Sequence, residues 1–133
     1  MAAGPAAWLV LYLIFQPQPS WQGVVDNARL LVMACLIYPA AEEIAFRGLL
    51  QGWLIRQPAL QRTSVAGFSG ANWVTSLLFS AAHLLHHSLP WAVLVMGPSL
   101  VFGWFRDRYQ SIVPGLLLHI LYNSGYFLLF WVS

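Results

Sequence analysis

The sequence predicts an all-α membrane protein, a polytopic bundle of about four to five transmembrane helices that encloses a polar site within the bilayer. Three observations lead to this fold class. Hydrophobic residues make up 59% of the 133 residues and charged residues only 8%, whereas a typical soluble domain is about 25% charged. The apolar residues form runs separated by short polar breaks, as the spans and loops of a membrane protein do. Several runs contain ionisable residues, which are costly in a bilayer and usually face the interior of a bundle.

The small number of charges excludes several classes of protein. The chain has 4 acidic and 6 basic residues, no lysine and a formal net charge of +2. This charge is too small to keep a chain disordered or to bind a phosphate backbone, so we expect the lipid bilayer and no nucleic acid as a partner. Cys35 is the single cysteine, and it permits neither an internal disulfide nor a thiolate zinc cluster.

We expect a single integral-membrane domain over residues 1–133. Counted from residue 1, the first apolar run, 6–15, reaches only about 22 Å as a helix, short of the roughly 30 Å hydrocarbon core. It is therefore a short tilted span, an interfacial helix or a trimmed remnant. The longer runs that we expect to be helical cover residues 24–55, 71–85, 91–105 and 112–132.

Prolines predict irregularities inside two of these runs. Pro39 predicts a kink in the run 24–55, and Gly97 with Pro98 predicts a break in the run 91–105. A broken helix is tolerated within a membrane where it faces protein or a water-filled cavity. We therefore expect the break at Gly97 and Pro98 to help admit water or substrate.

The arginines predict the orientation. Four of the six lie in the loops that follow the runs 24–55 and 91–105, and they are Arg56, Arg62, Arg106 and Arg108. Loops rich in arginine are usually cytoplasmic, so we expect both of these loops on the cytoplasmic side. The lysine-free, tryptophan-rich composition favours a bacterium with a high-GC genome, and hence the bacterial inner membrane.

Polar residues of three runs lie at similar depths in the predicted bilayer. Measured from the arginine-rich side at about 1.5 Å per residue, Glu42 and His83 lie roughly 18 Å deep. On the same scale His119 lies about 12 Å and Asn123 about 18 Å deep. Unrelated polar residues would have no reason to agree in depth, so we expect them to form one shared polar site.

The spacing of the polar residues indicates different roles. Glu43 and Arg47 are four residues apart and can meet as a buried ion pair, which leaves the carboxylate of Glu42 for chemistry. In an apolar site such a carboxylate can both take and return a proton, with His83 helping to hold a water molecule. His119 and Asn123 share one helix face and can offer two N–H donors to an oxyanion. These groups are the parts needed for peptide hydrolysis.

Three motifs resemble those of the CPBP (CAAX protease and bacteriocin-processing, or Abi) family of intramembrane endopeptidases. Residues 42–48, EEIAFRG, are similar to its EExxxR motif, residues 79–83, FSAAH, to FxxxH, and residues 119–123, HILYN, to HxxxN. The resemblance covers about residues 32–126. It implies that Glu42 and His83 activate water and that His119 and Asn123 stabilise the oxyanion. Supporting roles fall to Glu43, Arg47 and Phe79, of which we expect Phe79 to be a packing residue beneath the site.

The resemblance implies an intramembrane endopeptidase that hydrolyses a peptide bond in a membrane-associated or lipid-anchored protein or peptide, as in the processing of a sorting signal or a propeptide. The sequence leaves open whether the mechanism is glutamic or uses a divalent metal such as Zn²⁺, which Glu42, His83 and His119 would hold. Two other classes stay open: a non-enzymatic immunity protein that binds a peptide, and a carrier of ions or protons that uses the carboxylates as a relay.

Overall fold

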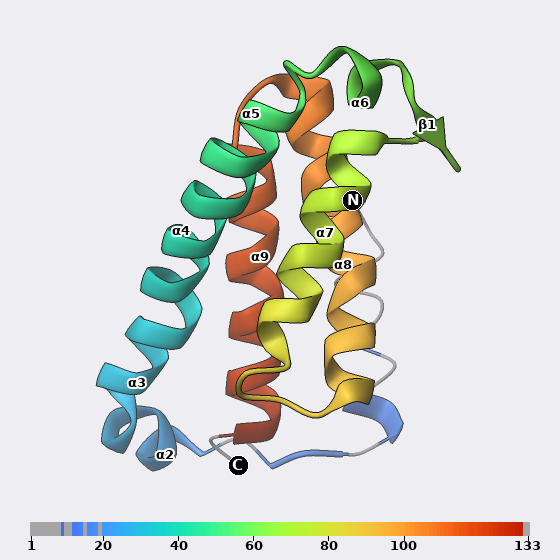
Figure 1. The fold of residues 1–133 in the computed structure, drawn as a ribbon. Coiled ribbons are helices and arrows are strands. Elements are labelled where there is room, and N and C mark those ends of the chain that lie inside the picture. Colours follow the sequence, from blue (N-terminus) through green and yellow to red (C-terminus); the bar gives the residue numbers. More distant parts are fainter. Residues whose placement is uncertain (1–8, 10–11, 15, 19, 132–133) are drawn as a thin grey trace. The chain divides into compact units, whose positions relative to one another are not determined.

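The structure is a computed structural model that describes residues 9, 12–14, 16–18 and 20–131. Most of the predicted first run, 6–15, lies outside the described residues. The predicted all-α class is confirmed (Figure 1). The α-helices are α2 (Trp21–Asp26), α3 (Ala28–Val32), α4 (Tyr38–Glu42), α5 (Gly52–Leu54), α6 (Pro58–Arg62), α7 (Gly70–His83), α8 (Leu89–Tyr109) and α9 (Val113–Tyr126). Three π-helical segments are η1 (Met33–Ile37), η2 (Glu43–Gln51) and η3 (Phe127–Trp131).

The loop after α6 contains a short hairpin that the sequence analysis did not predict. Strands β1 (Ser64–Val65) and β2 (Phe68–Ser69) pair antiparallel, with Ser64 opposite Ser69. Ala66 and Gly67 between them have φ of 52° and 81°, and two residues of positive φ make the turn that suits a two-residue hairpin. Ser69 then caps α7, because its hydroxyl accepts a hydrogen bond from the main-chain N–H of Asn72 at 3.0 Å.

The prediction of a break at Gly97 and Pro98 is wrong. Helix α8 continues through both residues from Leu89 to Tyr109. A proline removes only one N–H donor, and neighbouring helices can hold the chain helical around it. Helix α7 packs along α8 and supplies that support. Pro39 lies within α4, between η1 and η2, so the irregularity near this proline is a widening of the helical turn.

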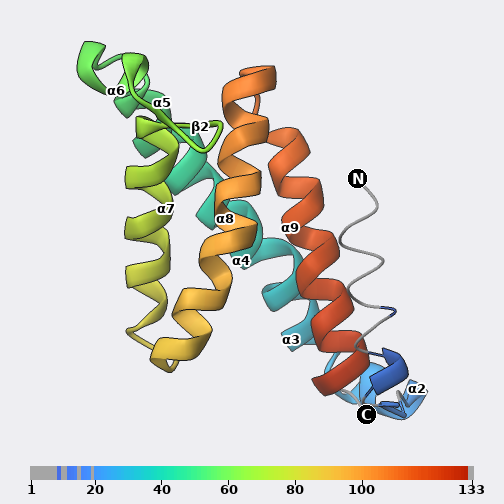
Figure 2. The ribbon, with the colours of Figure 1, turned by 90° about the vertical axis from the view of Figure 1, so that its right-hand side faces the viewer.

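The chain divides into two compact units. The first comprises Met1–Ala40 with Leu118–Ser133, and the second comprises Ala41–Leu117. Within the second unit α7 and α8 lie side by side, joined by a short turn, and η2 packs against both helices (Figure 2). The boundary of the units passes through α4 and through α9.

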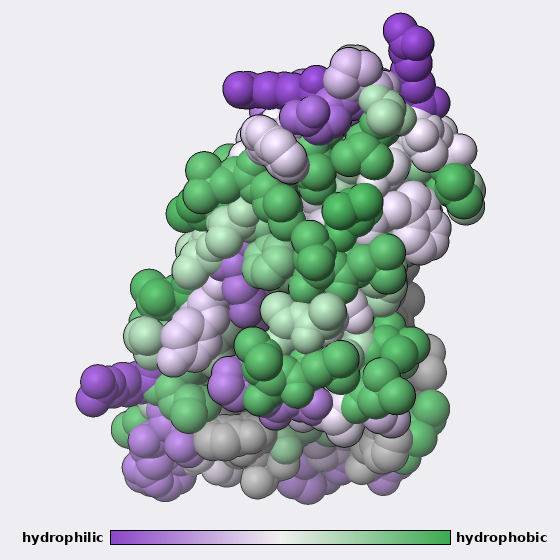
Figure 3. Space-filling view, in the orientation of Figure 1, coloured by the Kyte–Doolittle hydropathy of each residue, from purple (hydrophilic) through white to green (hydrophobic). Residues whose placement is uncertain are grey.

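The second unit buries many polar side chains and exposes many large apolar ones. Its fully buried side chains include Glu43, Arg47, Gln51, Asn72, Thr75, Ser76 and Ser99. Its exposed side chains include Leu49, Leu77, Leu78, Leu85, Val93 and Leu94. Much of the face seen in Figure 3 is hydrophobic. Soluble proteins show the opposite distribution, whereas a bilayer favours this one. Two helical stretches, Leu89–Tyr109 and Val113–Phe130, are long and apolar enough to cross a membrane.

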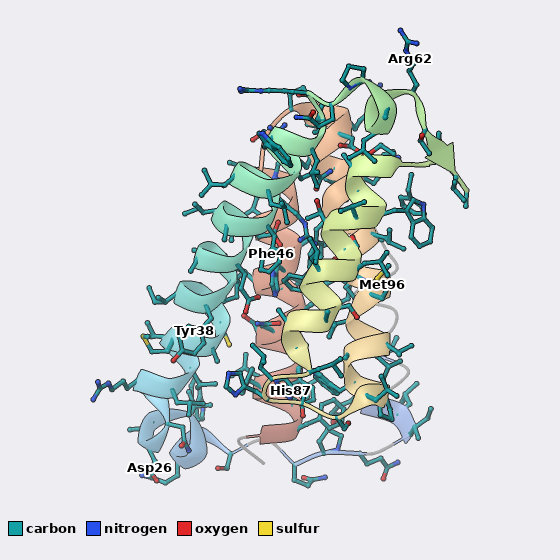
Figure 4. The ribbon with its side chains drawn as sticks, viewed as in Figure 1. Asp26, Tyr38, Phe46, Arg62, His87 and Met96 are labelled. Atoms are coloured by element: carbon teal, nitrogen blue, oxygen red, sulfur yellow. The ribbon has the colours of Figure 1, made fainter. Side chains whose placement is uncertain are left out.

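The arginine-bearing loops lie at one end of the second unit. The end of η2 is joined to the end of α8, because Gln51 Nε2 donates to the carbonyl of Gly103 at 2.9 Å and Arg106 Nε donates to the carbonyl of Arg47 at 3.1 Å. Hydrophilic side chains gather at this end in Figure 3, and Figure 4 labels Arg62 there. We call it the arginine-rich end. The structure thus places the two loops on the same side of this unit, as the sequence predicts.

We expect Gly103→Ala to destabilise the second unit. A Cβ atom at residue 103 would overlap Oδ1 of Asn72. The Asn72 side chain is held in place because its Nδ2 donates to the carbonyl of Leu100 at 2.9 Å. Such overpacking costs about 1–3 kcal/mol. Gly97→Ala is the matched control on the same helix, because nothing lies within 4 Å of its added Cβ. Thermal unfolding in detergent should show a lower midpoint for Gly103→Ala only, and equal midpoints would contradict the packing.

Candidate active site

One end of the second unit contains a pocket of about 130 Å³. Its walls come from the end of α4, from η2, from the last turn of α7 and from the chain after α7. Glu42 and His83, which the sequence predicts to act on one water molecule, both line it. The other lining residues are Phe46, Ala82, Phe79, His86 and His87, of which Figure 4 labels Phe46 and His87. The pocket therefore combines a carboxylate and imidazoles with an aromatic wall.

The hydrogen bonding of His83 determines which ring nitrogen can act as a base. Its Nδ1 lies 2.9 Å from the main-chain carbonyl of Phe79. A carbonyl can only accept, so Nδ1 carries the proton of the neutral ring and Nε2 keeps its lone pair. Phe79 lies four residues before His83, so this carbonyl belongs to the preceding turn of α7, which ends at His83. The neutral ring is thus held in the tautomer whose Nε2 can accept a proton.

Two aromatic rings contact the His83 ring. The ring of Phe79 lies 4.6 Å from it between centroids, and the ring of His87 stacks at 5.8 Å. Phe46 meets Phe79 edge to face at 5.1 Å. Phe79 is only 3% exposed, as expected for a packing residue beneath the site. These ring contacts restrict the rotation of the imidazole.

The predicted ion pair between Glu43 and Arg47 is present and fully buried. Arg47 Nε lies 3.8 Å from Glu43 Oε2, and Arg47 Nη2 donates to the hydroxyl and the carbonyl of Ser99 at 2.7 and 3.0 Å. The guanidinium also lies 4.8 Å from the ring centroid of Phe79. Arg47 thus connects η2 to α7 and to α8 directly beside the pocket.

Sequence reasoning missed a second set of buried polar residues toward the arginine-rich end. The amide of Gln51 donates to Asp107 at 2.8 Å, and Ser69 donates to the other oxygen of Asp107 at 2.7 Å. Ser76 donates to Asn72 at 3.1 Å. One signal was available, because Gln51 continues the four-residue spacing of Glu43 and Arg47. The partners of these residues lie in other helices, which spacing along one helix cannot reveal.

His119 and Asn123 belong to the first unit, whereas Glu42 and His83 belong to the second. His119 and Asn123 both lie on α9, and His119 is 6% exposed. Asn123 Nδ2 donates to the main-chain carbonyl of Ala34 at 2.9 Å. The structure therefore brings Glu42 and His83 to one pocket, and it gives Asn123 a bond that joins α9 to η1 within the first unit.

A metal ligand set is not formed by the pocket residues in this arrangement. Glu42, His83, His86 and His87 all line the pocket. Nevertheless, among the residues that the structure describes, no group of three His, Cys, Asp or Glu side chains is placed to hold one metal ion.

A comparison with protein families identifies the chain at the level of family. The model described as Rce1-like, type II CAAX prenyl endopeptidase, matches residues 24–125. The chain belongs to this family. The matched segment of the Rce1-like chain contains all three motifs and every predicted site residue. No curated protein and no solved structure matches the chain. With its two apolar helices, the Rce1-like chain is an integral membrane protein of a protease family.

We expect Arg47→Met to destabilise the protein strongly. Removing one member of a buried ion pair costs about 3–5 kcal/mol, because the other charge stays buried without its partner. The double variant Glu43→Gln with Arg47→Met removes both charges and should recover much of the loss. Unfolding of Arg47→Met, of the single variant Glu43→Gln and of the double variant in detergent measures this coupling. Simple addition of the two single effects in the double variant would mean that Glu43 and Arg47 do not interact.

Proposed function

We propose that the chain is an intramembrane endopeptidase in which Glu42 and His83 activate the attacking water. The observation that carries this proposal is that Glu42 and His83 line one pocket, with His83 Nδ1 bonded to a carbonyl and Nε2 available as an acceptor. Family membership supports protease activity over the peptide-binding and carrier functions.

The proposed reaction uses general acid–base catalysis. Glu42 takes a proton from water held with His83, and the hydroxide attacks the carbonyl carbon of the scissile bond. N–H groups of His119 and Asn123 stabilise the oxyanion of the tetrahedral intermediate. Glu42 then returns its proton to the leaving amine as the C–N bond breaks. The amide of Asn123 has two N–H groups, so its bond to Ala34 leaves one for the oxyanion.

This reaction requires α9 to present His119 and Asn123 to the pocket of the second unit. A bundle of four to five spans around a polar site, all within one domain, would satisfy that requirement. The fully buried polar residues of the second unit and its apolar exterior support such a bundle.

The pocket lies at the end of α7 opposite to the arginine-rich end, because α7 begins at the hairpin and ends at His83. We place the arginine-rich end in the cytoplasm of a bacterium, following the distribution of arginines. The scissile bond then lies toward the outer side of the inner membrane. That position suits a lipid-anchored or membrane-associated protein whose sorting signal or propeptide is removed after export.

Glu42→Gln should abolish cleavage while the protein stays folded, because glutamine keeps the shape of the side chain but cannot take a proton. Mass spectrometry of membrane-protein termini from cells with equal amounts of wild type and variant measures this and identifies the substrate. Asp26→Asn is the control, since Asp26 is an exposed carboxylate bonded to Gln22. Identical termini in wild type and Glu42→Gln would refute the proposal and favour a peptide-binding protein.

Asn123→Ala should slow cleavage by about 10²- to 10³-fold if the amide is an oxyanion donor. Asn27→Ala is the matched control, because Asn27 also donates its amide to a main-chain carbonyl, that of Gly23 at 2.9 Å. The measurement is kcat on the identified substrate, with thermal unfolding of both variants. A stability loss without a fall in kcat would assign Asn123 to fixing α9 on η1 alone.

We expect cleavage to persist after treatment with a zinc chelator, since the proposed water activation uses only Glu42 and His83. The assay compares chelated and untreated protein on the identified substrate. Loss of cleavage that added Zn²⁺ restores would contradict the metal-free mechanism.

A further inference from the structure

Apart from the two facing atoms of the Glu43–Arg47 ion pair, three fully buried polar atoms of the second unit have no hydrogen-bond partner among the residues that the structure describes. They are Nη1 of Arg47, Oγ1 of Thr75 and Oε1 of Gln51. An unsatisfied buried donor or acceptor costs about 1–3 kcal/mol, so buried polar groups nearly always have a partner, either protein or ordered water. Three such atoms within one small helical unit therefore indicate a bound ligand.

The contacts of their neighbours give the order of these three residues along two packed helices. Arg47 and Gln51 are four residues apart on η2, which packs against α7. On α7, Thr75 lies four residues before Phe79, whose ring covers the Arg47 guanidinium. Thr75 also lies three residues after Asn72, which contacts Gly103. The carbonyl of Gly103 in turn accepts a hydrogen bond from the amide of Gln51. Along the direction of the packed helices, Thr75 therefore lies between Arg47 and Gln51, and we call the three residues the row.

The chemistry of the row identifies its ligand. Nη1 of Arg47 can only donate a hydrogen bond, Oε1 of Gln51 can only accept one, and the hydroxyl of Thr75 can do both. An anion would suit Arg47 but not Gln51, and a cation would suit the two oxygens but not Arg47. Water both donates and accepts, and buried water molecules typically have two to four polar partners.

We propose that bound water molecules connect Arg47, Thr75 and Gln51 in a hydrated row inside the second unit. At the arginine-rich end the row meets Asp107 and Ser69, which are half-buried and bonded to each other. At its other end it reaches Phe79, whose ring lies against Arg47 and also lines the pocket. The row delivers water from the arginine-rich end to the reaction, and this role, unlike the bound water itself, rests on the proposed hydrolysis.

X-ray radiolysis of the full-length protein in lipid nanodiscs and H₂¹⁸O, followed by mass spectrometry, tests for the bound water. Phe102 is the reporter, because its side chain is 2% exposed and its ring centroid lies 6.0 Å from Arg47. Phe105 on the same helix is the control, since it is 9% exposed and packs against Trp104 and Tyr109. We expect Phe102 to gain ¹⁸O several-fold faster than Phe105. Labelling of Phe102 at or below the rate of Phe105 would overturn the proposal.

Thr75→Val removes the central hydroxyl and keeps the shape of the side chain, so it should lower the labelling of Phe102 several-fold. Ser76→Ala is the matched variant, because Ser76 is an equally buried hydroxyl on α7 that already donates to Asn72. It should leave the labelling unchanged. Equal labelling in Thr75→Val and wild type would contradict a row through Thr75. If this variant does not fold, the comparison of Phe102 with Phe105 in the wild type still decides.

Cleavage kinetics test the delivery of water separately. Thr75→Val should lower kcat several-fold with KM unchanged, whereas Ser76→Ala should not. Normal kcat in a Thr75→Val protein with reduced labelling would overturn delivery through the row. Labelling of Phe102 in a wild-type protein that cleaves nothing would instead refute the proposed function and leave the bound water supported.

Discussion

The second unit depends on the interactions of one buried group, the guanidinium of Arg47. It pairs with Glu43, donates twice to Ser99 and lies against the ring of Phe79, so a single side chain joins η2, α7 and α8. A charge held inside a membrane protein is tolerable only with such partners, because lipid offers none. This packing fixes the position of Phe79. The main-chain carbonyl of Phe79 in turn fixes the tautomer of His83.

The solvent explains why polar residues form the interior. In water, leucine and phenylalanine would be driven inward, but in a bilayer they lose nothing by facing outward, and helices associate through packing and polar contacts. Gly103 permits the close approach of Asn72, and hydrogen bonds then join α7 to the main chain of α8. The polar side chains that join the helices also include groups that can hydrogen-bond to water. A hydrolytic site within a membrane needs such a supply of water.

Much of the fold could be predicted because it depends on local pattern. The helices after residue 20, the ion pair four residues apart and the ends of the runs at polar breaks all follow from neighbours along the chain. The hairpin at Ala66 and Gly67 was missed because strands of two residues leave almost no periodic signal. The break expected at Pro98 is absent because a proline weakens a helix only locally, whereas packing against α7 supports α8 along its length.

The sequence by itself determined that this chain is a helical membrane protein and which residues carry the family's motifs, since both depend on composition and short-range spacing. The tertiary structure alone decided that Ser99 holds Arg47 and that Gln51 binds Gly103, and it places Glu42 and His83, expected from their depths to share a site, in one pocket. The first two contacts join residues 52 positions apart. No periodicity along one helix encodes them, because they depend on which faces of separate helices meet.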